Sequence, residues 1–486
     1  MQIANSPQDV LLIHAPVLEA YSAADCGNCD CACPMPMILP LSNGYTEDMF
    51  LSLHPNASFM PLHTDALLAY VPSYSTGVVV NTVLYEWLQT LTAPQSAYSL
   101  SQSLGKERVD QCVASGLLTN SKILPTKAAS KTLMAWLHVT NACNLRCTYC
   151  YINKNTEAMS AETGYAAIDA VLRSALTNGF ESVLLKYAGG EASLNLGIVL
   201  ELDRYMHRQA KAQHLHYQGV LLSNGIGLTK ARLTSIQQAG LCLMISLDGV
   251  GAINDEQRMF ANGAGSFQAV ANTIERALAI GLKPLISITV TGQSAGSLVN
   301  IVQWVLDREL RFSLNFYREN NYTTAYQELN LEEGRIIDGM RAAYGAIEQR
   351  LPIYSLLGSL LDRANLLAPH NNPCGVGENY LVIDHNGSIA SCQMEIEQPL
   401  TSIKIDDPLA IIRLHPAGIH HIPVDERDGC RSCDWRYWCA GGCPSAVYRA
   451  TGRYDRRSPN CRIYQALFPA VLRLEGLRIL KYGISI

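Results

Sequence analysis

Short apolar runs alternate with longer amphipathic stretches through the middle of the chain. Six such runs lie at residues 133–139, 182–188, 219–223, 241–247, 284–290 and 311–317. Runs of this length predict buried strands. The segments between them, such as 162–179 and 266–281, carry the 3.6-residue period of a helix and end in Gly. Strands that alternate with helices predict an α/β fold with a parallel sheet, either doubly wound or an incomplete barrel, with its chemistry at the carboxyl ends of the strands.

The regions on either side of this sheet read differently. Residues 58–122 suggest short strands followed by helices, and a polar linker at 119–131 separates them from the sheet. The predicted division is a cysteine-containing N-terminal extension (1–57), a small winged-helix-like domain (58–122), the partial barrel (131–320), a helical bridge (321–373), a cysteine-rich domain (374–470) and a C-terminal tail (471–486).

Composition narrows the possible functions. The chain has 486 residues, 48% of them hydrophobic, with a net charge of -5 and a pI near 6.2. This acidic balance argues against nucleic-acid binding. No apolar window is long enough for a membrane span and no signal peptide is apparent, so we expect a cytoplasmic protein that does not bind membranes. Sixteen cysteines in a reducing compartment are better explained as metal ligands than as disulfides.

Three cysteines follow the first predicted strand within eight residues. The segment NACNLRCTYCY places them at Cys143, Cys147 and Cys150. Three thiolates can hold three irons of a 4Fe–4S cube and leave the fourth iron open to another ligand. A zinc knuckle with its fourth ligand elsewhere in the chain is the alternative.

The CxxxCxxC spacing, with Tyr149 before the last cysteine, resembles the signature of the radical S-adenosylmethionine (SAM) superfamily. The resemblance implies a six-stranded partial barrel whose open iron is chelated by the amino and carboxylate groups of SAM. It also implies reductive cleavage of SAM to a 5'-deoxyadenosyl radical that abstracts hydrogen from a substrate.

Later strand ends fit the same resemblance. Gly189, Gly190 and Glu191 follow the second strand and correspond to the glycine-glycine-glutamate that contacts the SAM amino group, although the usual proline is Ala192 here. Ser246 and Arg258 resemble the pair that binds the ribose and carboxylate of SAM. Tyr149 completes the predicted cofactor contacts.

The C-terminal cysteines form a second motif. The spacing C-x12-G-x4-C, a gap, C-x2-C-x5-C-x3-C, a gap and C resembles the seven-cysteine SPASM extension of radical enzymes that modify peptides and proteins. The family pattern assigns two auxiliary 4Fe–4S clusters, besides the radical SAM cluster, to these cysteines. One would be held by Cys430, Cys433, Cys439 and Cys461, and the other by Cys374, Cys392, Cys443 and an unassigned fourth ligand. A zinc-ribbon site is the alternative.

Residues 58–122 resemble the small domain, similar to the pyrroloquinoline quinone biosynthesis chaperone, that binds leader peptides by strand addition. A structural N-terminal cap is the alternative. Cys26, Cys29, Cys31 and Cys33 form a further group that could bind metal, donate the missing cluster ligand or belong to a flexible segment.

These features predict a radical SAM/SPASM enzyme that modifies a ribosomally made peptide and receives electrons from a donor such as flavodoxin or ferredoxin. The sequence does not choose among thioether formation, carbon–carbon crosslinking and side-chain oxidation. Glu395 is a candidate catalytic base, although an exposed structural glutamate is the plainer interpretation. The alternatives are an anaerobic sulfatase-maturating type of protein oxidase and a non-catalytic iron–sulfur carrier or scaffold.

Overall fold

The structure is a computed structural model of the whole chain. It describes residues 11–14, 45–72, 77–120, 130–323, 327–367, 369–415, 419 and 422–486. Cys26, Cys29, Cys31 and Cys33, whose role the sequence leaves open, lie outside the described residues.

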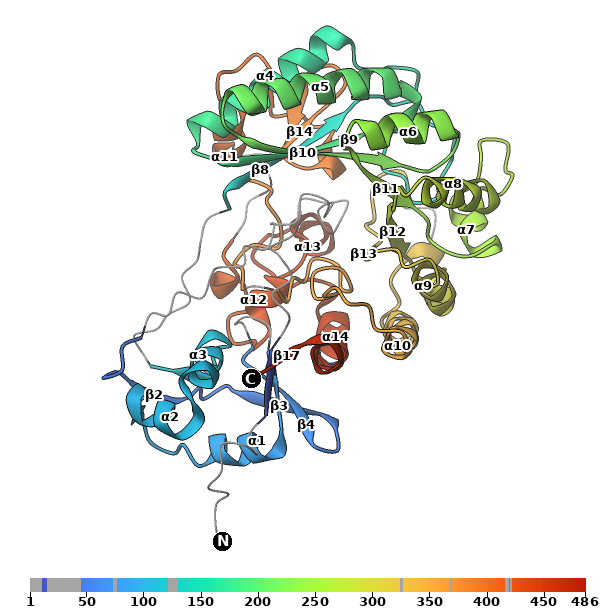
Figure 1. Ribbon diagram of the computed structural model, residues 1–486. Helices are drawn as coiled ribbons and strands as arrows, with labels where there is room; N and C mark the ends of the chain where they lie inside the picture. The colour runs from blue at the N-terminus through green and yellow to red at the C-terminus, as the bar shows by residue number, and fades with distance from the viewer. Residues whose placement is uncertain are drawn as a thin grey trace.

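A parallel sheet forms the centre of the molecule (Figure 1). Its six consecutive strands pair in chain order, as the sequence predicts for a partial barrel. They are β8 (Thr132–His138), β9 (Ser182–Ala188), β10 (His216–Ser223), β11 (Cys242–Ser246), β12 (Leu285–Val290) and β13 (Phe312–Phe316). All six predicted strands are therefore present, and the predicted α/β fold class is confirmed.

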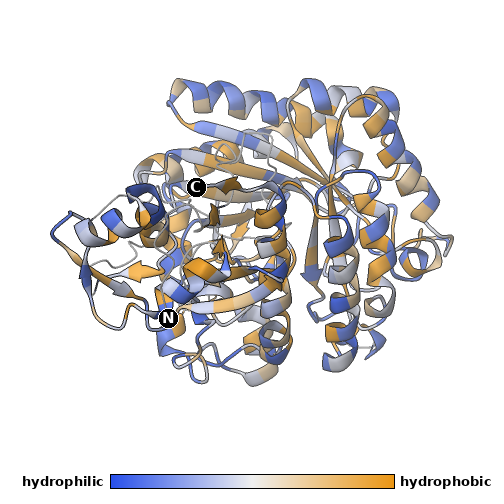
Figure 2. Ribbon diagram, turned by 60° about the horizontal axis from the view of Figure 1, so that its bottom comes forward, coloured by the Kyte–Doolittle hydropathy of each residue, from blue (hydrophilic) through white to orange (hydrophobic). Residues whose placement is uncertain are grey.

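The two faces of this sheet are both buried, which explains why its strands read as continuous apolar runs. In β8, Leu133 and Leu137 pack with the helices, whereas Met134 and Trp136 pack on the opposite, inner face with Cys374 and Cys392. Figure 2 shows the strands mostly in the hydrophobic colour and the helices with alternating faces.

Helices cover the outer face of the sheet (Figure 1). They are α4 (Ala161–Thr177), α5 (Leu196–Ala212), α6 (Lys230–Gln238), α7 (Ala252–Gln257), α8 (Phe267–Ala279) and α9 (Leu298–Leu306). Ser160 caps α4 by accepting a hydrogen bond from the Thr163 amide, and its apolar stripe packs against β8.

The cysteine-rich region extends the sheet, which the sequence did not predict. Strand β14 (Tyr380–Ile383) pairs in parallel with β8, and β15 (Ser388–Ala390) and β16 (Thr401–Ser402) continue the sheet to nine strands. Shorter helices complete this region: α11 (Pro408–Leu414), α12 (Arg436–Cys439) and α13 (Pro444–Thr451). Strand β8 is therefore internal, because β14 of the cysteine-rich region pairs with the edge of β8 that β9 leaves open.

The C-terminal end of the chain also differs from the predicted tail. Helix α14 (Cys461–Tyr482) runs without interruption past residue 470 and packs against α10 (Glu333–Gln349). The final strand β17 (Ile484–Ser485) pairs with β1 (Leu12–His14) of the N-terminal region. Residues 471–486 thus connect the two ends of the chain.

The N-terminal region contains the predicted short strands and helices. Its strands are β1, β2 (Phe50–Leu53), β3 (Ser58–His63), β4 (Ala66–Tyr70), β5 (Val78–Val80), β6 (Gln95–Ser96) and β7 (Leu118–Thr119). Its helices are α1 (Thr82–Gln89), α2 (Ala97–Leu104) and α3 (Lys106–Ala114). One sheet has the order β17-β1-β5-β4-β3, and a smaller one has the order β6-β2-β7. Among the described helices, none combines the length and apolar character needed to cross a lipid bilayer.

Candidate active site

The loop after β8 carries the three-cysteine motif and is held by backbone hydrogen bonds to the last residue of α7 and to the segment after it. The Arg146 amide donates to the Met259 carbonyl at 2.8 Å, and the Thr148 amide donates to the Gln257 carbonyl at 3.0 Å. Cys143, Cys147 and Cys150 lie in this loop, and each is half-buried.

The three thiols lie near enough to influence one another. Burial raises the pKa of Cys147 to about 12, and the neighbouring Cys150 and Cys143 thiolates raise it further, while Arg258 opposes them. A group of buried thiolates needs positive charge beside it, and bound iron supplies that charge. Among the described residues, no three His, Cys, Asp or Glu side chains are grouped tightly enough for a single metal ion.

The two glycines after β9 allow the next loop to rest on the cysteine loop. The Gly190 amide donates to the Thr140 carbonyl at 2.7 Å, and the Glu191 amide donates to the Ala142 carbonyl at 2.8 Å. A β-carbon on Gly190 would lie 2.5 Å from the Ala142 carbonyl oxygen. Close approach of two backbones therefore requires glycine here, whether or not it contacts a cofactor.

Glu191 is almost fully buried, and its carboxylate accepts three hydrogen bonds. The donors are the Ser193 amide at 3.0 Å, the Ser223 hydroxyl at 2.7 Å and the Asn224 amide at 2.6 Å. Burial raises the pKa of Glu191, and these hydrogen bonds oppose the rise. Sequence reasoning missed Ser223 and Asn224, although the polar SNG that ends the third predicted strand signalled them. Asn224 also donates to Cys143 Sγ at 3.8 Å and so joins this group to the cysteine loop.

A buried polar triad lies beside the cysteine loop. Tyr149 donates to Asp248 and accepts from Arg258, whose guanidinium lies 3.5 Å from the Asp248 carboxylate. Arg258 Nε is buried without a partner, so the guanidinium retains a donor for a carboxylate-bearing ligand. Ser246 ends β11, half-buried on the inner face. Sequence analysis named Tyr149, Ser246 and Arg258 but overlooked Asp248, which follows Ser246 by two residues.

The C-terminal thiols fall into two groups. Burial raises the pKa of Cys430 to about 11 and of Cys439 to about 12, and the neighbouring thiolates of the first group raise both further. That first group contains Cys430, Cys433, Cys439 and Cys461. In the second group, burial raises the pKa of Cys392, and Cys443 and Cys374 add to the effect. Thiols that the sequence pattern assigns to the same cluster therefore lie near one another, and the assignment of the two clusters stays a prediction.

Arg427 lies near thiols of both groups and was not foreseen from the sequence. Its side chain is fully buried, and Nη1 and Nη2 have no hydrogen-bond partner. Burial lowers its pKa, whereas the thiolates of Cys430, Cys374, Cys439 and Cys443 raise it. Its Nε donates a hydrogen bond to the Ile422 carbonyl at 2.9 Å, but a buried guanidinium with two bare Nη groups is costly unless anionic groups surround it. Thiolate-ligated clusters at both groups of thiols would supply that charge, so the residues present fit such clusters.

Glu395, the candidate base, lies close to the second group. Its carboxylate accepts a hydrogen bond from the Ser391 hydroxyl at 3.2 Å, and burial raises its pKa. Glu395 is half-buried, so it is not a fully exposed surface residue, and it is not enclosed in the barrel.

Comparison with known proteins supports the fold and the first motif. Residues 137–305 match the Radical SAM superfamily. An uncharacterized protein of Archaeoglobus fulgidus is 24% identical over 68% of this chain and 79% of its own length. The sporulation killing factor maturation protein SkfB of Bacillus subtilis is 25% identical over 34% of this chain and 38% of its own length.

Among solved structures, native anSMEcpe with bound AdoMet and Cp18Cys peptide superposes with a TM-score of 0.58 at 17% identity, covering 71% of this chain and 99% of that one. A fold of this kind implies SAM and a 4Fe–4S cluster as cofactors. Residues 137–305 therefore form a domain of the Radical SAM superfamily.

Proposed function

We propose that this enzyme oxidatively modifies a ribosomally made peptide and uses two auxiliary 4Fe–4S clusters to do so. Arg427 carries the proposal, because a fully buried guanidinium near two groups of thiols fits two anionic clusters. SkfB, a maturation protein, and anSMEcpe, solved with a bound peptide, support a peptide substrate. When bound, SAM and the reduced cluster of Cys143, Cys147 and Cys150 supply the 5'-deoxyadenosyl radical that removes a hydrogen atom from the substrate.

We assign the residues of the SAM site by their chemistry. Glu191 offers a buried carboxylate for the SAM ammonium, and Arg258 offers its unpartnered Nε side to the SAM carboxylate. Gly189 and Gly190 let the backbone approach the cofactor, and Ser246 contacts its ribose. Tyr149 and Asp248 hold the Arg258 guanidinium in place through their hydrogen bond and ion pair.

The N-terminal domain is the proposed site for the leader part of the peptide. Strand β3 is the edge of its sheet, so peptide could add to it. Pro61 has no amide hydrogen, and its carbonyl accepts a hydrogen bond from Arg473 of α14. A leader would therefore pair with residues 58–60, beside the Phe59 ring that packs on Tyr85 with centroids 4.9 Å apart.

The electron donor has a proposed docking place next to the outer thiols. A surface cavity of about 450 Å³ is lined by Glu333, Thr451, Arg456, Arg457, Ser458, Pro459, Cys461 and Arg462. Arg457 and Arg462 lie near enough to the Cys461 thiol to stabilise its thiolate. Arginines around a half-buried cluster ligand suit an acidic one-electron donor such as flavodoxin or ferredoxin.

The test is anaerobic reconstitution of the full chain with iron and sulfide, followed by reduction and addition of SAM and candidate peptides from neighbouring genes. We expect about twelve irons per chain for three cubes, with 5'-deoxyadenosine and a modified peptide as products. Cys147→Ala should abolish 5'-deoxyadenosine, and Cys392→Ala should abolish peptide modification while leaving the SAM-cleaving cluster in place. About four irons per chain, with a modified peptide, would refute the auxiliary clusters but not the peptide substrate.

The sulfatase-maturating type of protein oxidase is the second candidate because it shares the barrel and the seven-cysteine domain. Binding of a leader peptide to the chain, lost when Phe59 is replaced by Asp, favours the peptide maturase. Oxidation of a sulfatase-derived peptide without any leader favours the other enzyme. The non-catalytic carrier considered from the sequence does not agree with a domain of this enzyme superfamily.

A further inference from the structure

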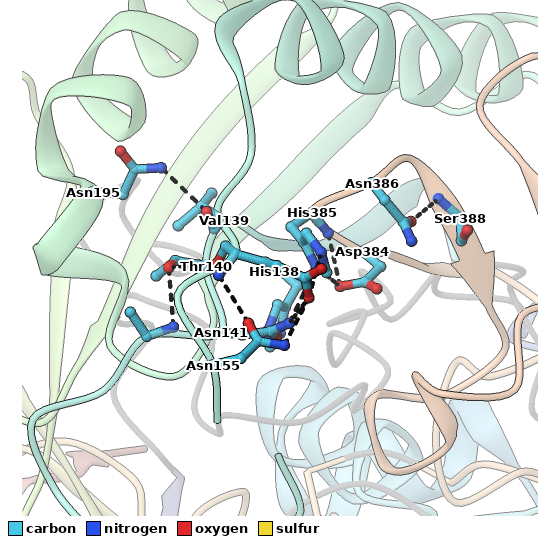
Figure 3. Close-up of polar contacts among 12 residues, drawn as sticks. His138, Val139, Thr140, Asn141, Asn155, Asn195, Asp384, His385, Asn386 and Ser388 are labelled. Carbon is cyan, nitrogen blue, oxygen red and sulfur yellow. Dashed lines mark hydrogen bonds and ion pairs between the residues drawn. The ribbon is translucent and has the colours of Figure 1, made fainter. Parts of the chain in front are cut away.

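Two histidines far apart in the sequence face each other at the junction of the barrel and the cysteine-rich hairpin (Figure 3). His138 is the last residue of β8, and His385 follows β14, the strand that pairs with β8. Their ring centroids are 6.5 Å apart. By strand alternation, His138 shares the inner face with Met134 and Trp136, and it is fully buried.

Asn141 determines which nitrogen of His138 carries the proton. His138 Nε2 lies 2.7 Å from Asn141 Oδ1, and an amide oxygen can only accept, so Nε2 is protonated. The Asn141 amide nitrogen lies 3.4 Å from the Glu157 carboxylate, an acceptor, which supports this orientation, and it also lies 3.5 Å from His385 Nδ1. His138 Nδ1 is buried without a partner. Burial lowers the pKa of His138, which keeps the ring neutral and the Nδ1 lone pair free.

His385 connects this buried nitrogen acceptor with the surface. His385 Nδ1 lies 2.8 Å from the Asp384 carboxylate, and its Nε2 lies 3.5 Å from Glu157. The Glu157 side chain is 62% exposed, whereas that of His385 is 13% exposed. One bridging water could span the gap between the two rings. The side chains thus form a polar path from the inner face of the barrel to solvent.

We propose that His138 accepts, at Nδ1, the proton that the peptide substrate loses, and that His385 and Glu157 convey it to solvent. Asn141 acts as a positioning residue, since it fixes the tautomer of His138. This inference rests on the proposed function.

The proposed step balances for each expected product. A thioether, a carbon–carbon crosslink and an oxidised side chain all form with the loss of two hydrogens. The first hydrogen leaves the attacked carbon as an atom. Its C–H bond breaks, and the hydrogen joins the 5'-deoxyadenosyl radical to form 5'-deoxyadenosine. The second hydrogen leaves its sulfur, carbon or oxygen as a proton as the new bond forms. An oxidised auxiliary 4Fe–4S cluster, which the C-terminal cysteines would hold, would take up the remaining electron. The proton needs an acceptor inside the barrel, and His138 provides one.

The test compares His138→Gln and His385→Gln with His216→Gln, a control at the exposed start of β10. The substrate is the peptide that the wild type modifies, deuterated at the attacked carbon. We expect deuterium transfer to 5'-deoxyadenosine within about threefold of wild type in all variants, because hydrogen-atom abstraction does not need the base. Modified peptide should fall about 100-fold in His138→Gln, the usual contribution of a general base, with a smaller loss in His385→Gln. The control should match the wild type.

A wild-type ratio of modified peptide to transferred deuterium in His138→Gln would overturn the proposal. Loss of iron, of thermal stability and of deuterium transfer together would also overturn it, because His138 would then be structural. A readout independent of the clusters is ¹⁵N NMR of histidine-labelled protein, in which His138 should appear neutral with the proton on Nε2; a charged ring or an Nδ1–H tautomer contradicts the assignment. If the wild type modifies no peptide, the proposed function fails first and the inference falls with it.

Discussion

Replacing Gly190 with Ala tests whether the loop after β9 sets the position of the radical-cluster cysteines. The added β-carbon would lie 2.5 Å from the Ala142 carbonyl oxygen and 2.6 Å from that of Asn141. Ordinary contacts begin at 3.4 Å, so one backbone must move by about 0.9 Å. Both obstacles are backbone atoms of the loop that carries Cys143, and neither can rotate away.

The expected cost follows from this displacement. Forcing extra volume into a packed place costs about 1–3 kcal/mol of folding free energy. A shift of about 1 Å in a reacting group lowers a rate by about 100-fold. We therefore expect Gly190→Ala to lower the free energy of unfolding by about 2 kcal/mol and SAM cleavage by about 100-fold.

Chemical denaturation of the apo protein, iron content after reconstitution and the rate of 5'-deoxyadenosine formation measure these effects. The matched control is Gly197→Ala in α5, where an added β-carbon meets no atom within 4 Å. A helical Gly→Ala change there should stabilise the protein by up to about 1 kcal/mol. Wild-type cleavage and stability in Gly190→Ala would refute the argument that close backbone packing positions the cysteines.

Three further changes test other parts of the structure. Arg427→Met removes a positive charge beside both thiol groups. One charge at about 6 Å in an effective dielectric of about 20 is worth about 3 kcal/mol, so the reduction potential of the auxiliary clusters should fall by about 0.1 V in EPR-monitored titrations. An unchanged potential would show that Arg427 does not act on the clusters. Glu475 and Arg478 form an ion pair whose side chains are both 3% exposed. Glu475→Leu removes the carboxylate partner of Arg478 and should lower the free energy of unfolding in denaturant by about 3–5 kcal/mol, and adding Arg478→Met should recover part of that loss. Equal losses in the single and the double variant would argue against an ion-pair effect. Arg457→Glu with Arg462→Glu should weaken flavodoxin-driven turnover at low salt but not dithionite-driven turnover, and equal losses with both reductants would exclude a docking role.

The sequence located most of the candidate SAM site because its signals are local. Cys143, Cys147 and Cys150 are spaced within one loop, and Gly190 with Glu191 directly follows a strand. Their neighbours in space were harder to identify. Asp248 and Ser223 come from other strand ends, where a polar residue marks the end of the strand but does not show which buried group it will contact.

The sequence by itself determined the order of strands and helices, the parallel sheet and the three cysteine motifs, because hydrophobic period and ligand spacing act over a few residues. Tertiary structure alone decided that β14 joins β8, that Arg427 lies near both C-terminal thiol groups, and that His385 meets His138. The contacts of β14 with β8 and of His385 with His138 join segments more than 240 residues apart. They depend on how the sheet edges pair and on which polar atoms remain buried without a partner, and neither is written in local spacing.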